Sequence, residues 1–169
     1  MTALTQDATG NDLTYRIIGA AMAVHNAIGP GYKEEVYERA LHAELNGRGI
    51  ASQNQYPVDV CHAGEQVALF YLDLLVEETV VVELKAFSHQ LTNDEIAQVI
   101  NYLKATGAPV GLLFNFGRRK LEYRRIYPPK TLQQPVGRLG RDDVVRSQPS
   151  TNPKRTQGPA SHDEGDPST

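Results

Sequence analysis

Two apolar segments meet in the stretch FYLDLLVEETVVVELKAF, residues 70–87, and this stretch decides the fold. Both segments are rich in Val, Leu, Phe and Tyr, which is typical of β-strands. Between them Glu77, Glu78 and Thr79 predict the loop of a hairpin, although the loop lacks the Gly or Asn that is usual in tight turns. Because the segments are so continuously apolar, we expect both strands to be covered on both faces.

Three charged residues interrupt these strands: Asp73 in the first, and Glu83 and Lys85 in the second. An unpaired buried carboxylate costs several kcal/mol, so such residues are retained when they pair with each other or hold a metal ion. Glu83 and Lys85 are two residues apart and project from one face of their strand. If the strands pair across the loop, Asp73 lies opposite Glu83, with Cβ atoms roughly 4.5–5.5 Å apart. A slip of one residue would place the two carboxylates on opposite faces.

The residues alone leave two interpretations of this cluster open. In the first, Lys85 neutralises one acid in a buried ion pair that is purely structural. In the second, the acids hold a divalent cation beside a lysine, an arrangement suited to the hydrolysis of phosphodiester bonds. Hard oxygen ligands suit Mg²⁺ or Mn²⁺ and not zinc.

A third carboxylate, Glu34, lies near the start of a predicted helix, on the same face as Tyr37, Leu41 and Leu45. That face is apolar and is expected to be buried, so Glu34 is expected to point towards the sheet. The helix dipole favours a carboxylate in the first turn. Its neighbour Glu35 projects about 100° away and is expected to lie in solvent.

The order of the predicted elements is ααβββαββ, which indicates an α/β fold, a three-layer-like sandwich around a central mixed sheet. Apolar residues recur at helical spacing over 13–28 and 36–45. Residues 92–95, Thr-Asn-Asp-Glu, have the form of a capping box and open a helix that continues to about Thr106. The predicted strands are 55–61, 67–76, 80–87, 110–116 and 121–127.

A chain of 169 residues predicts one folded domain with flanking segments. We expect residues 1–12 to form a flexible N-terminus, 13–127 the domain, and 128–169 a disordered tail. Seven of the ten prolines lie in the tail, which has too few large apolar side chains to offset its chain entropy. The formal net charge of −3 excludes a strongly basic protein that coats nucleic acid.

A single cysteine, Cys61, excludes an intrachain disulfide framework and fits a reducing compartment. The first twelve residues lack the charged and apolar regions of a secretory signal. No apolar run approaches the roughly 18 residues of a membrane span. We therefore expect a cytoplasmic protein with no membrane partner; the sequence leaves the oligomeric state open.

Four motifs succeed one another in the order of a known family. Residues 31–37, GYKEEVY, fit Gly-x-x-Glu-x-x-Tyr; Asp73, the Glu-Leu-Lys of residues 83–85, and QVINYL at 98–103 come after them. Over about residues 13–127 the chain resembles the GxxExxY family, a branch of the PD-(D/E)xK nuclease superfamily. A lone Glu-x-Lys is weak evidence, whereas four motifs in order are specific. The resemblance implies a restriction-endonuclease-like core and cleavage of nucleic acid, without distinguishing DNA from RNA.

The resemblance also implies roles for the acidic cluster. Asp73 and Glu83 would hold Mg²⁺, or Mn²⁺, with the backbone carbonyl of Leu84 as a further ligand and Glu34 completing the metal site. Lys85 would activate the attacking water and offset charge in the transition state. The proline of the superfamily's Pro-Asp is replaced by leucine here, which the chemistry tolerates.

Gln98 and Tyr102 resemble a Gln-x-x-x-Tyr signature, in which they would support the site or the substrate phosphate. The helical pattern by itself predicts instead that both lie in solvent. The apolar stripe of that helix lies almost opposite them and consists of Ile96, Ile100 and Leu103.

Arg118 and Arg119 belong to the one basic patch of the predicted domain, which also contains Lys120, Arg124 and Arg125. Such a patch could contact a phosphate backbone. It could equally keep an edge hairpin from pairing with other chains. Both interpretations stay open.

The leading expectation is a metal-dependent nuclease. The alternative is a noncatalytic module that keeps the nuclease fold and binds a nucleic acid or a protein. A hydrolase of a small phosphodiester is a weaker third hypothesis, since a fold alone does not establish activity.

Overall fold

The computed structural model describes residues 11–130 of the chain. These residues form three helices and one five-stranded sheet in the predicted order. The elements are α1 (Asn11–Ile28), α2 (Glu34–Gly47), β1 (Ser52–His62), β2 (Glu65–Val76), β3 (Val80–Lys85), α3 (Asn93–Thr106), β4 (Val110–Asn115) and β5 (Glu122–Ile126).

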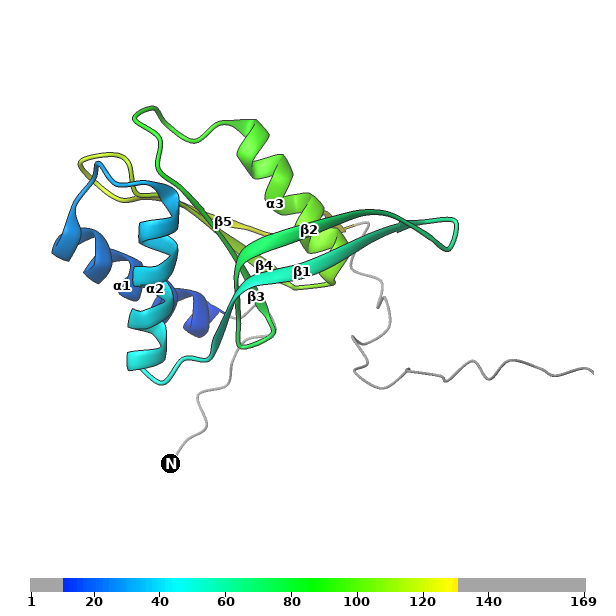
Figure 1. Cartoon of the computed structure of the whole chain (residues 1–169), viewed down its shortest axis with the longest axis horizontal. Coiled ribbons are helices and arrows are strands. Elements are labelled where there is room, and N and C mark those ends of the chain that lie inside the picture. Colours follow the sequence, from blue (N-terminus) through cyan, green and yellow to red (C-terminus); the bar gives the residue numbers. More distant parts are fainter. Residues whose placement is uncertain (1–10, 131–169) are drawn as a thin grey trace, which may run out of the picture. The chain divides into compact units, whose positions relative to one another are not determined.

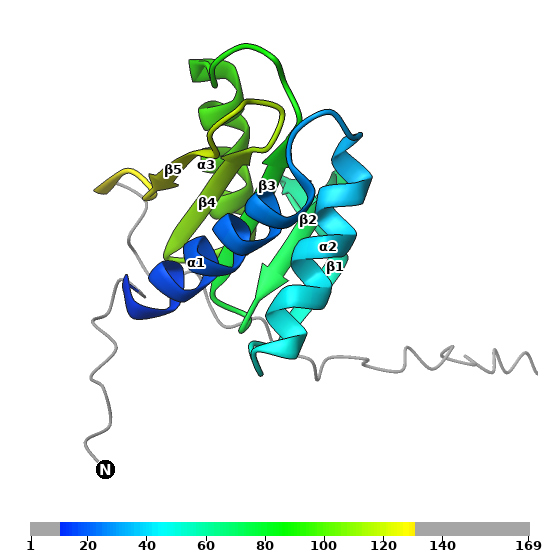
Figure 2. The ribbon, with the colours of Figure 1, turned by 90° about the vertical axis from the view of Figure 1, so that its left-hand side faces the viewer.

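The sheet is mixed, with strand order β1-β2-β3-β4-β5. Only β3 and β4 are parallel, because α3 connects them, and the other neighbouring pairs are antiparallel. Helices α1 and α2 cover one face of the sheet and α3 covers the other (Figures 1 and 2). The expected three-layer α/β sandwich, consistent with a restriction-endonuclease-like core, is therefore confirmed.

Each face of the sheet has its own apolar core. The core under α1 and α2 includes Leu74 and Leu84, and the core under α3 includes Leu72 and Leu75. Leu72 and Leu74 are two residues apart on β2, yet they lie in different cores. The strand therefore twists at Asp73, between them, and the outer part of β2 leaves the sheet in a long hairpin with β1 (Figure 1).

This hairpin corrects one expectation. The inner part of β2 and all of β3 up to Leu84 are buried, as predicted, except for half-buried Asp73. The outer part of β2 is not covered on both faces, since Val67, Leu69, Phe70 and Tyr71 are exposed. An apolar run could not reveal where its strand leaves the sheet.

The capping box is present as predicted. The Thr92 hydroxyl accepts a hydrogen bond from the Asp94 amide (3.2 Å), and the Glu95 carboxylate accepts one from the Thr92 amide (2.6 Å). These contacts satisfy amides that the first turn of α3 would otherwise leave unpaired.

The segments at the two ends stay predictions. The expected flexible N-terminus 1–12 and the expected tail 128–169 lie almost entirely outside the described residues. Among the described helices, none has the length and apolar character that crossing a membrane demands.

The turn after β4 is pressed against the segment that comes after β3. A Cβ added to Gly117 would lie 2.5 Å from the carbonyl carbon of Ala86 and 2.5 Å from the carbonyl oxygen of Phe87. Backbone atoms cannot move aside as a flexible side chain can. Only glycine therefore fits here.

We predict that Gly117→Ala lowers the free energy of unfolding by about 2–3 kcal/mol, because the added methyl overpacks a backbone contact. Urea denaturation followed by circular dichroism measures the change. Gly47→Ala is the control: a Cβ at this helical position meets nothing within 4 Å, so the stability should stay the same or rise by less than about 1 kcal/mol. Equal stability of the two variants would contradict the contact.

Candidate active site

The β2–β3 hairpin has the register that places Asp73 opposite Glu83. Val76 pairs with Val80, and the last β2–β3 pair is Leu74 with Val82, one step before the two acids. The loop achieves this with left-handed backbone at Glu77 (φ 48°) and Glu78 (φ 56°) in place of glycine. A hydrogen bond from the Ala51 amide to the Glu77 carboxylate (2.8 Å) helps to hold it.

Beyond Leu74 and Val82 no further β2–β3 pair forms among the described residues, and the Asp73 side chain takes over the contact between the strands. Its Oδ2 accepts a hydrogen bond from the backbone amide of Leu84 at 2.7 Å. The carboxylate is therefore held at the point where β2 leaves the sheet, with Glu83 on the facing strand.

Lys85 lies between two acids from different elements. Its ammonium is 2.7 Å from Glu83 Oε1 and 3.9 Å from Glu34 Oε1 at the start of α2. Glu83 is almost fully buried, and its Oε2 has no hydrogen-bond partner among the described residues. Buried polar atoms normally have a partner, so this oxygen is suited to a ligand.

The Gly-x-x-Glu-x-x-Tyr motif forms the turn that brings Glu34 to the sheet. Gly31 has φ 112°, a conformation that favours glycine. The Tyr37 hydroxyl donates to the Gly29 carbonyl (2.8 Å) and accepts from the Tyr32 amide (3.2 Å). The tyrosine ring stacks on Phe116 with centroids 4.7 Å apart. As expected, Glu35 is exposed.

The acids raise one another's proton affinity. Burial, and next the Glu83 charge, raise the pKa of Asp73 to about 7. Burial is also the main cause that raises the pKa of Glu34 and that of Glu83, against the opposing effect of Lys85. Burial lowers the pKa of Lys85, but the carboxylates of Glu83, Glu34 and Asp73 together outweigh it, and the net shift is upward. The cluster is thus short of positive charge.

These residues fit a hard divalent cation by their chemistry. Three carboxylates against one ammonium leave a formal charge of −2 when all are ionised, and Glu83 Oε2 is an unsatisfied oxygen. Within residues 11–130, however, no three His, Cys, Asp or Glu side chains stand close enough together to enclose an ion. In this arrangement the Lys85 ammonium contacts the oxygen beside the unsatisfied one.

Gln98 and Tyr102 lie together on α3, where the Gln98 amide donates to the Tyr102 hydroxyl at 2.9 Å. Tyr102 is buried, contrary to the helical pattern, because Val99 and Leu103 extend the buried side of α3 towards it. Burial, and next the Glu83 charge, raise the pKa of Tyr102. Its hydroxyl therefore lies within electrostatic reach of the acidic cluster.

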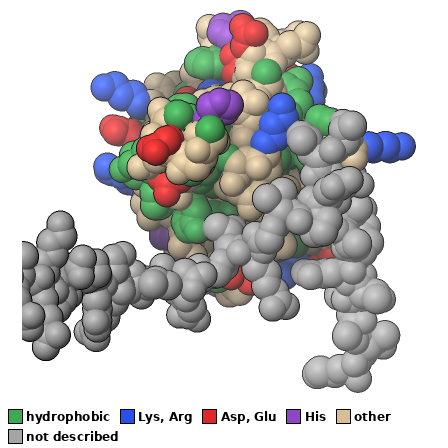
Figure 3. All heavy atoms as spheres, turned by 90° about the vertical axis from the view of Figure 1, so that its right-hand side faces the viewer, with side chains coloured by type: hydrophobic (Ala, Val, Ile, Leu, Met, Phe, Trp, Pro, Cys, Tyr) green, Lys and Arg blue, Asp and Glu red, His purple; other side chains and the backbone are tan. Residues whose placement is uncertain are grey.

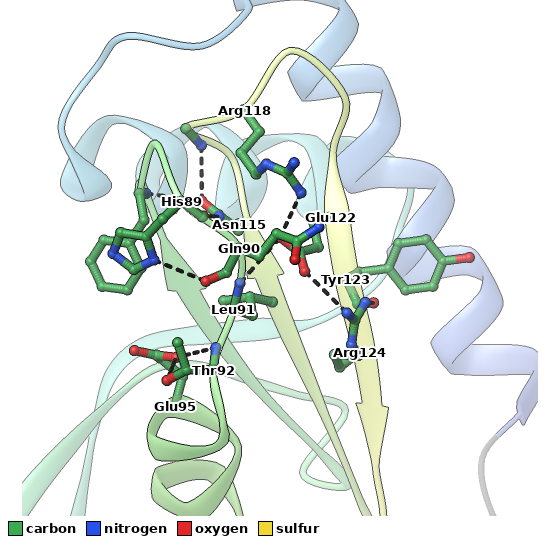
Figure 4. Close-up of polar contacts among 12 residues, drawn as sticks. His89, Gln90, Leu91, Thr92, Glu95, Asn115, Arg118, Glu122, Tyr123 and Arg124 are labelled. Carbon is green, nitrogen blue, oxygen red and sulfur yellow. Dashed lines mark hydrogen bonds and ion pairs between the residues drawn. The ribbon is translucent and has the colours of Figure 1, made fainter.

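Arg118 and Arg119 differ in their surroundings. The Arg118 guanidinium contacts Glu122 Oε2 at 3.2 Å (Figure 4). The backbone carbonyl oxygen of Arg118 accepts a hydrogen bond from His25 Nε2 at 2.8 Å. Arg119 is exposed, and both arginines line a hollow of about 800 Å³ together with Ser88, Gly117 and Lys120. The structure thus gives Arg118 an ion pair within the fold and leaves Arg119 at the surface, with both side chains at the hollow.

Asn115 fixes the segment that comes after Lys85. Its Oδ1 accepts from the amides of Phe87 (2.9 Å) and Gly117 (3.1 Å), and its Nδ2 donates to the His89 carbonyl (2.8 Å; Figure 4). Asn115 is fully buried and pairs with Lys85 across β3 and β4. One side chain therefore ties together the segments that follow β3 and β4.

Two residues near the cluster were not predicted from the sequence. Gln55 lies opposite Asp73 by the β1–β2 register and has φ 51°. Its side chain donates to Glu38 Oε2 at 2.9 Å, and the Glu38 charge acts on Glu34. Glu38 could have been found, because it stands four residues after Glu34 on the buried helix face. No sequence signal marks Gln55.

Similarity to known proteins extends over most of the described chain. A family model described as "PD-(D/E)XK nuclease superfamily" matches residues 11–126. No curated protein matches the sequence. The solved structure of SSO0001 is 15% identical, with a TM-score of 0.46, over 56% of this chain and 50% of that chain. The chain thus spans half the length of that protein.

We predict that, in a chelator, the protein becomes less stable as the pH rises from 4 to 7. Asp73 holds its proton up to about pH 7 in the folded chain, against 3.8 ordinarily. Folding therefore takes up a proton in this pH range. The stability that the bound proton contributes is lost as the pH rises to about 7 and above. Asp73→Asn keeps an acceptor for the Leu84 amide and should add about 2 kcal/mol at pH 8, after allowance for solvent screening of this half-buried group.

Urea denaturation at several pH values measures this dependence. Asp59→Asn, at an exposed position on β1, is the control and should change the stability by less than about 0.5 kcal/mol. A stability that rises with pH in the wild type, or a destabilised Asp73→Asn, would show that Asp73 is not strained by its surroundings.

Proposed function

Since the chain belongs to the PD-(D/E)XK nuclease superfamily, we propose that it is a metal-dependent nuclease that hydrolyses phosphodiester bonds in nucleic acid. One observation carries the proposal. Asp73, Glu83 and Lys85, with Glu34 from α2, meet where β2 separates from β3, and a buried carboxylate oxygen there has no partner among the described residues. This is the residue set that metal-assisted hydrolysis of a phosphodiester needs.

We assign the metal ligands to Asp73, Glu83, Glu34 and the carbonyl oxygen of Leu84. Oxygen donors of this kind favour Mg²⁺ or Mn²⁺. When bound, the cation supplies a polarised water and a countercharge for the phosphate.

Lys85 is the proton-handling and charge-stabilising group of the proposal. Its ammonium donates to Glu83 and lies near Glu34, and from this place it can donate to the attacking water or to a phosphate oxygen. The Asp73 contact with the Leu84 amide fixes the strand that carries Lys85. Substrate would take the hydrogen bond that Lys85 now gives to Glu83.

Gln98, Tyr102, Arg118 and Arg119 are proposed to position the substrate. Gln98 donates to Tyr102, whose hydroxyl lies within electrostatic reach of the acids. Arg119 is exposed and suited to a phosphate contact, whereas Arg118 would have to give up its ion pair with Glu122 to contact a phosphate.

We further propose that the chain belongs to the GxxExxY branch and acts in the cytoplasm.

The alternative is a noncatalytic module that binds nucleic acid or protein through the same fold. The short Lys85–Glu83 ion pair favours it, since this contact satisfies one acid without any cation. The two hypotheses differ in whether the acids take up a metal ion.

We predict cleavage of DNA or RNA by the purified protein with Mg²⁺ or Mn²⁺ and no cleavage in EDTA. Asp73→Asn and Lys85→Ala should each lower the rate by at least about 100-fold, because each removes a group that stabilises the transition state. Gel assays on single-stranded and duplex substrates measure this. Lys104→Ala, on the exposed side of α3, should cleave normally. Full activity of both site variants would refute the proposal.

We also predict that millimolar Mg²⁺ raises the melting temperature of the wild-type protein, because a ligand that binds only the folded chain stabilises it by about 1–3 kcal/mol at 10- to 100-fold excess over Kd. Asp73→Asn, which lacks one charged ligand, should gain much less. Differential scanning calorimetry with and without Mg²⁺ gives the comparison. A wild-type transition that no divalent ion moves would favour the noncatalytic alternative.

A further inference from the structure

A groove shares Gln98 and Tyr102 with the proposed site. It lies between α3 and the outer part of the β1–β2 hairpin and has a volume of about 380 Å³, within the roughly 300–1,000 Å³ of small-ligand sites. Its lining residues are Val60, Phe70, Asp94, Ala97, Gln98, Asn101 and Tyr102. Figure 3 views the side on which the hairpin ends, where hydrophobic side chains and other uncharged groups, backbone included, cover much of the surface between scattered charged side chains.

The lining combines aromatic rings with amide groups. Phe70 from the hairpin and Tyr102 from α3 form a tilted ring contact, with centroids 6.1 Å apart and an angle of 56° between the rings. Gln98 and Asn101 add side-chain amides, and Asp94 adds one carboxylate. Aromatic faces stack on nucleobases, and amides and carboxylates match the donors and acceptors on base edges.

Tyr102 relates the groove to the proposed active site, because it lines the groove and its hydroxyl accepts the hydrogen bond from Gln98. The charges of Glu83, Lys85 and Asp73 act on this hydroxyl. The groove is therefore a candidate site for the base of a nucleotide whose phosphate lies at these three residues.

Phe70 is directed to this groove and not to the outer face of the hairpin. Its β1 partner is Val58, which is buried in the core under α3. Leu69 and Tyr71, as its neighbours on the strand, project to the other face. About half of the Phe70 side chain nevertheless remains exposed, at 46%, so an incoming ring would bury apolar surface there.

We propose that this groove binds one unpaired base of a nucleic-acid strand and so makes single-stranded nucleic acid the preferred substrate. The inference rests on the proposed nuclease function and names its substrate class. A base within a duplex is stacked on both sides and paired at its edge, so it can enter the groove only after unstacking and unpairing, which cost a few kcal/mol.

The test measures binding without cleavage. A short oligonucleotide that carries the fluorescent base 2-aminopurine is titrated with the full chain, with Ca²⁺ in place of Mg²⁺. We expect quenching on binding of the single strand, and at least tenfold weaker binding of the matched duplex. DNA and RNA versions of the strand distinguish the two sugars.

Two variants act on the groove in opposite ways. Phe70→Ala removes one ring, and Ala97→Phe fills the groove from α3; each should weaken single-strand binding at least tenfold. Leu69→Ala is the control, since Leu69 has the same exposure, at 46%, and projects to the other face. It should bind like the wild type. Circular dichroism verifies that each variant is folded.

Three results would overturn the inference: no quenching with wild-type protein, equal affinity for duplex and single strand, or groove variants that bind like the wild type. A loss of self-association in Phe70→Ala on gel filtration would instead assign the groove to a second copy of the chain. A protein that binds single strands through Phe70 but cleaves none of them would refute the nuclease proposal alone.

Discussion

The site depends on the burial of carboxylates that outnumber the positive charges beside them. Asp73, Glu83 and Glu34 all have a raised pKa, with burial as the first cause, and Lys85 compensates for only part of their charge. A fold that brings these groups together loses stability at neutral pH relative to one that lacks them. The rest of the sheet must therefore hold them in place.

Backbone contacts at the point where β2 separates from β3 keep these groups in place. β2 leaves β3 after Leu74, and the Asp73 carboxylate replaces the missing strand contact through the Leu84 amide. Opposite Asp73, Gln55 takes a left-handed conformation and donates to Glu38. Strained backbone at a non-glycine residue costs about 1–3 kcal/mol and persists only where surrounding contacts enforce it.

Periodicity and residue type were enough to predict the features that lie within one or two neighbouring elements. These are the hairpin register, the helix start at residues 92–95 and the acids of the cluster. Features that depend on three elements could not be predicted. The outer part of β2 is exposed although it is as apolar as the inner part, and Tyr102 is buried although it lies off the apolar stripe. Both result from the position of α3 against the hairpin, which no local pattern encodes.

A purely structural role explains this cluster poorly. Well-packed apolar side chains stabilise a sheet as well as a buried ion pair does, or better. A structural pair would also need only Lys85 and one acid. Two further acids are present, however: the Glu34 charge raises the pKa of Glu83, and the Glu83 charge raises that of Asp73. The unsatisfied Glu83 Oε2 adds a further penalty. A bound cation would account for this excess of negative charge. Its binding free energy would offset the stability that the chain loses when it brings the carboxylates together.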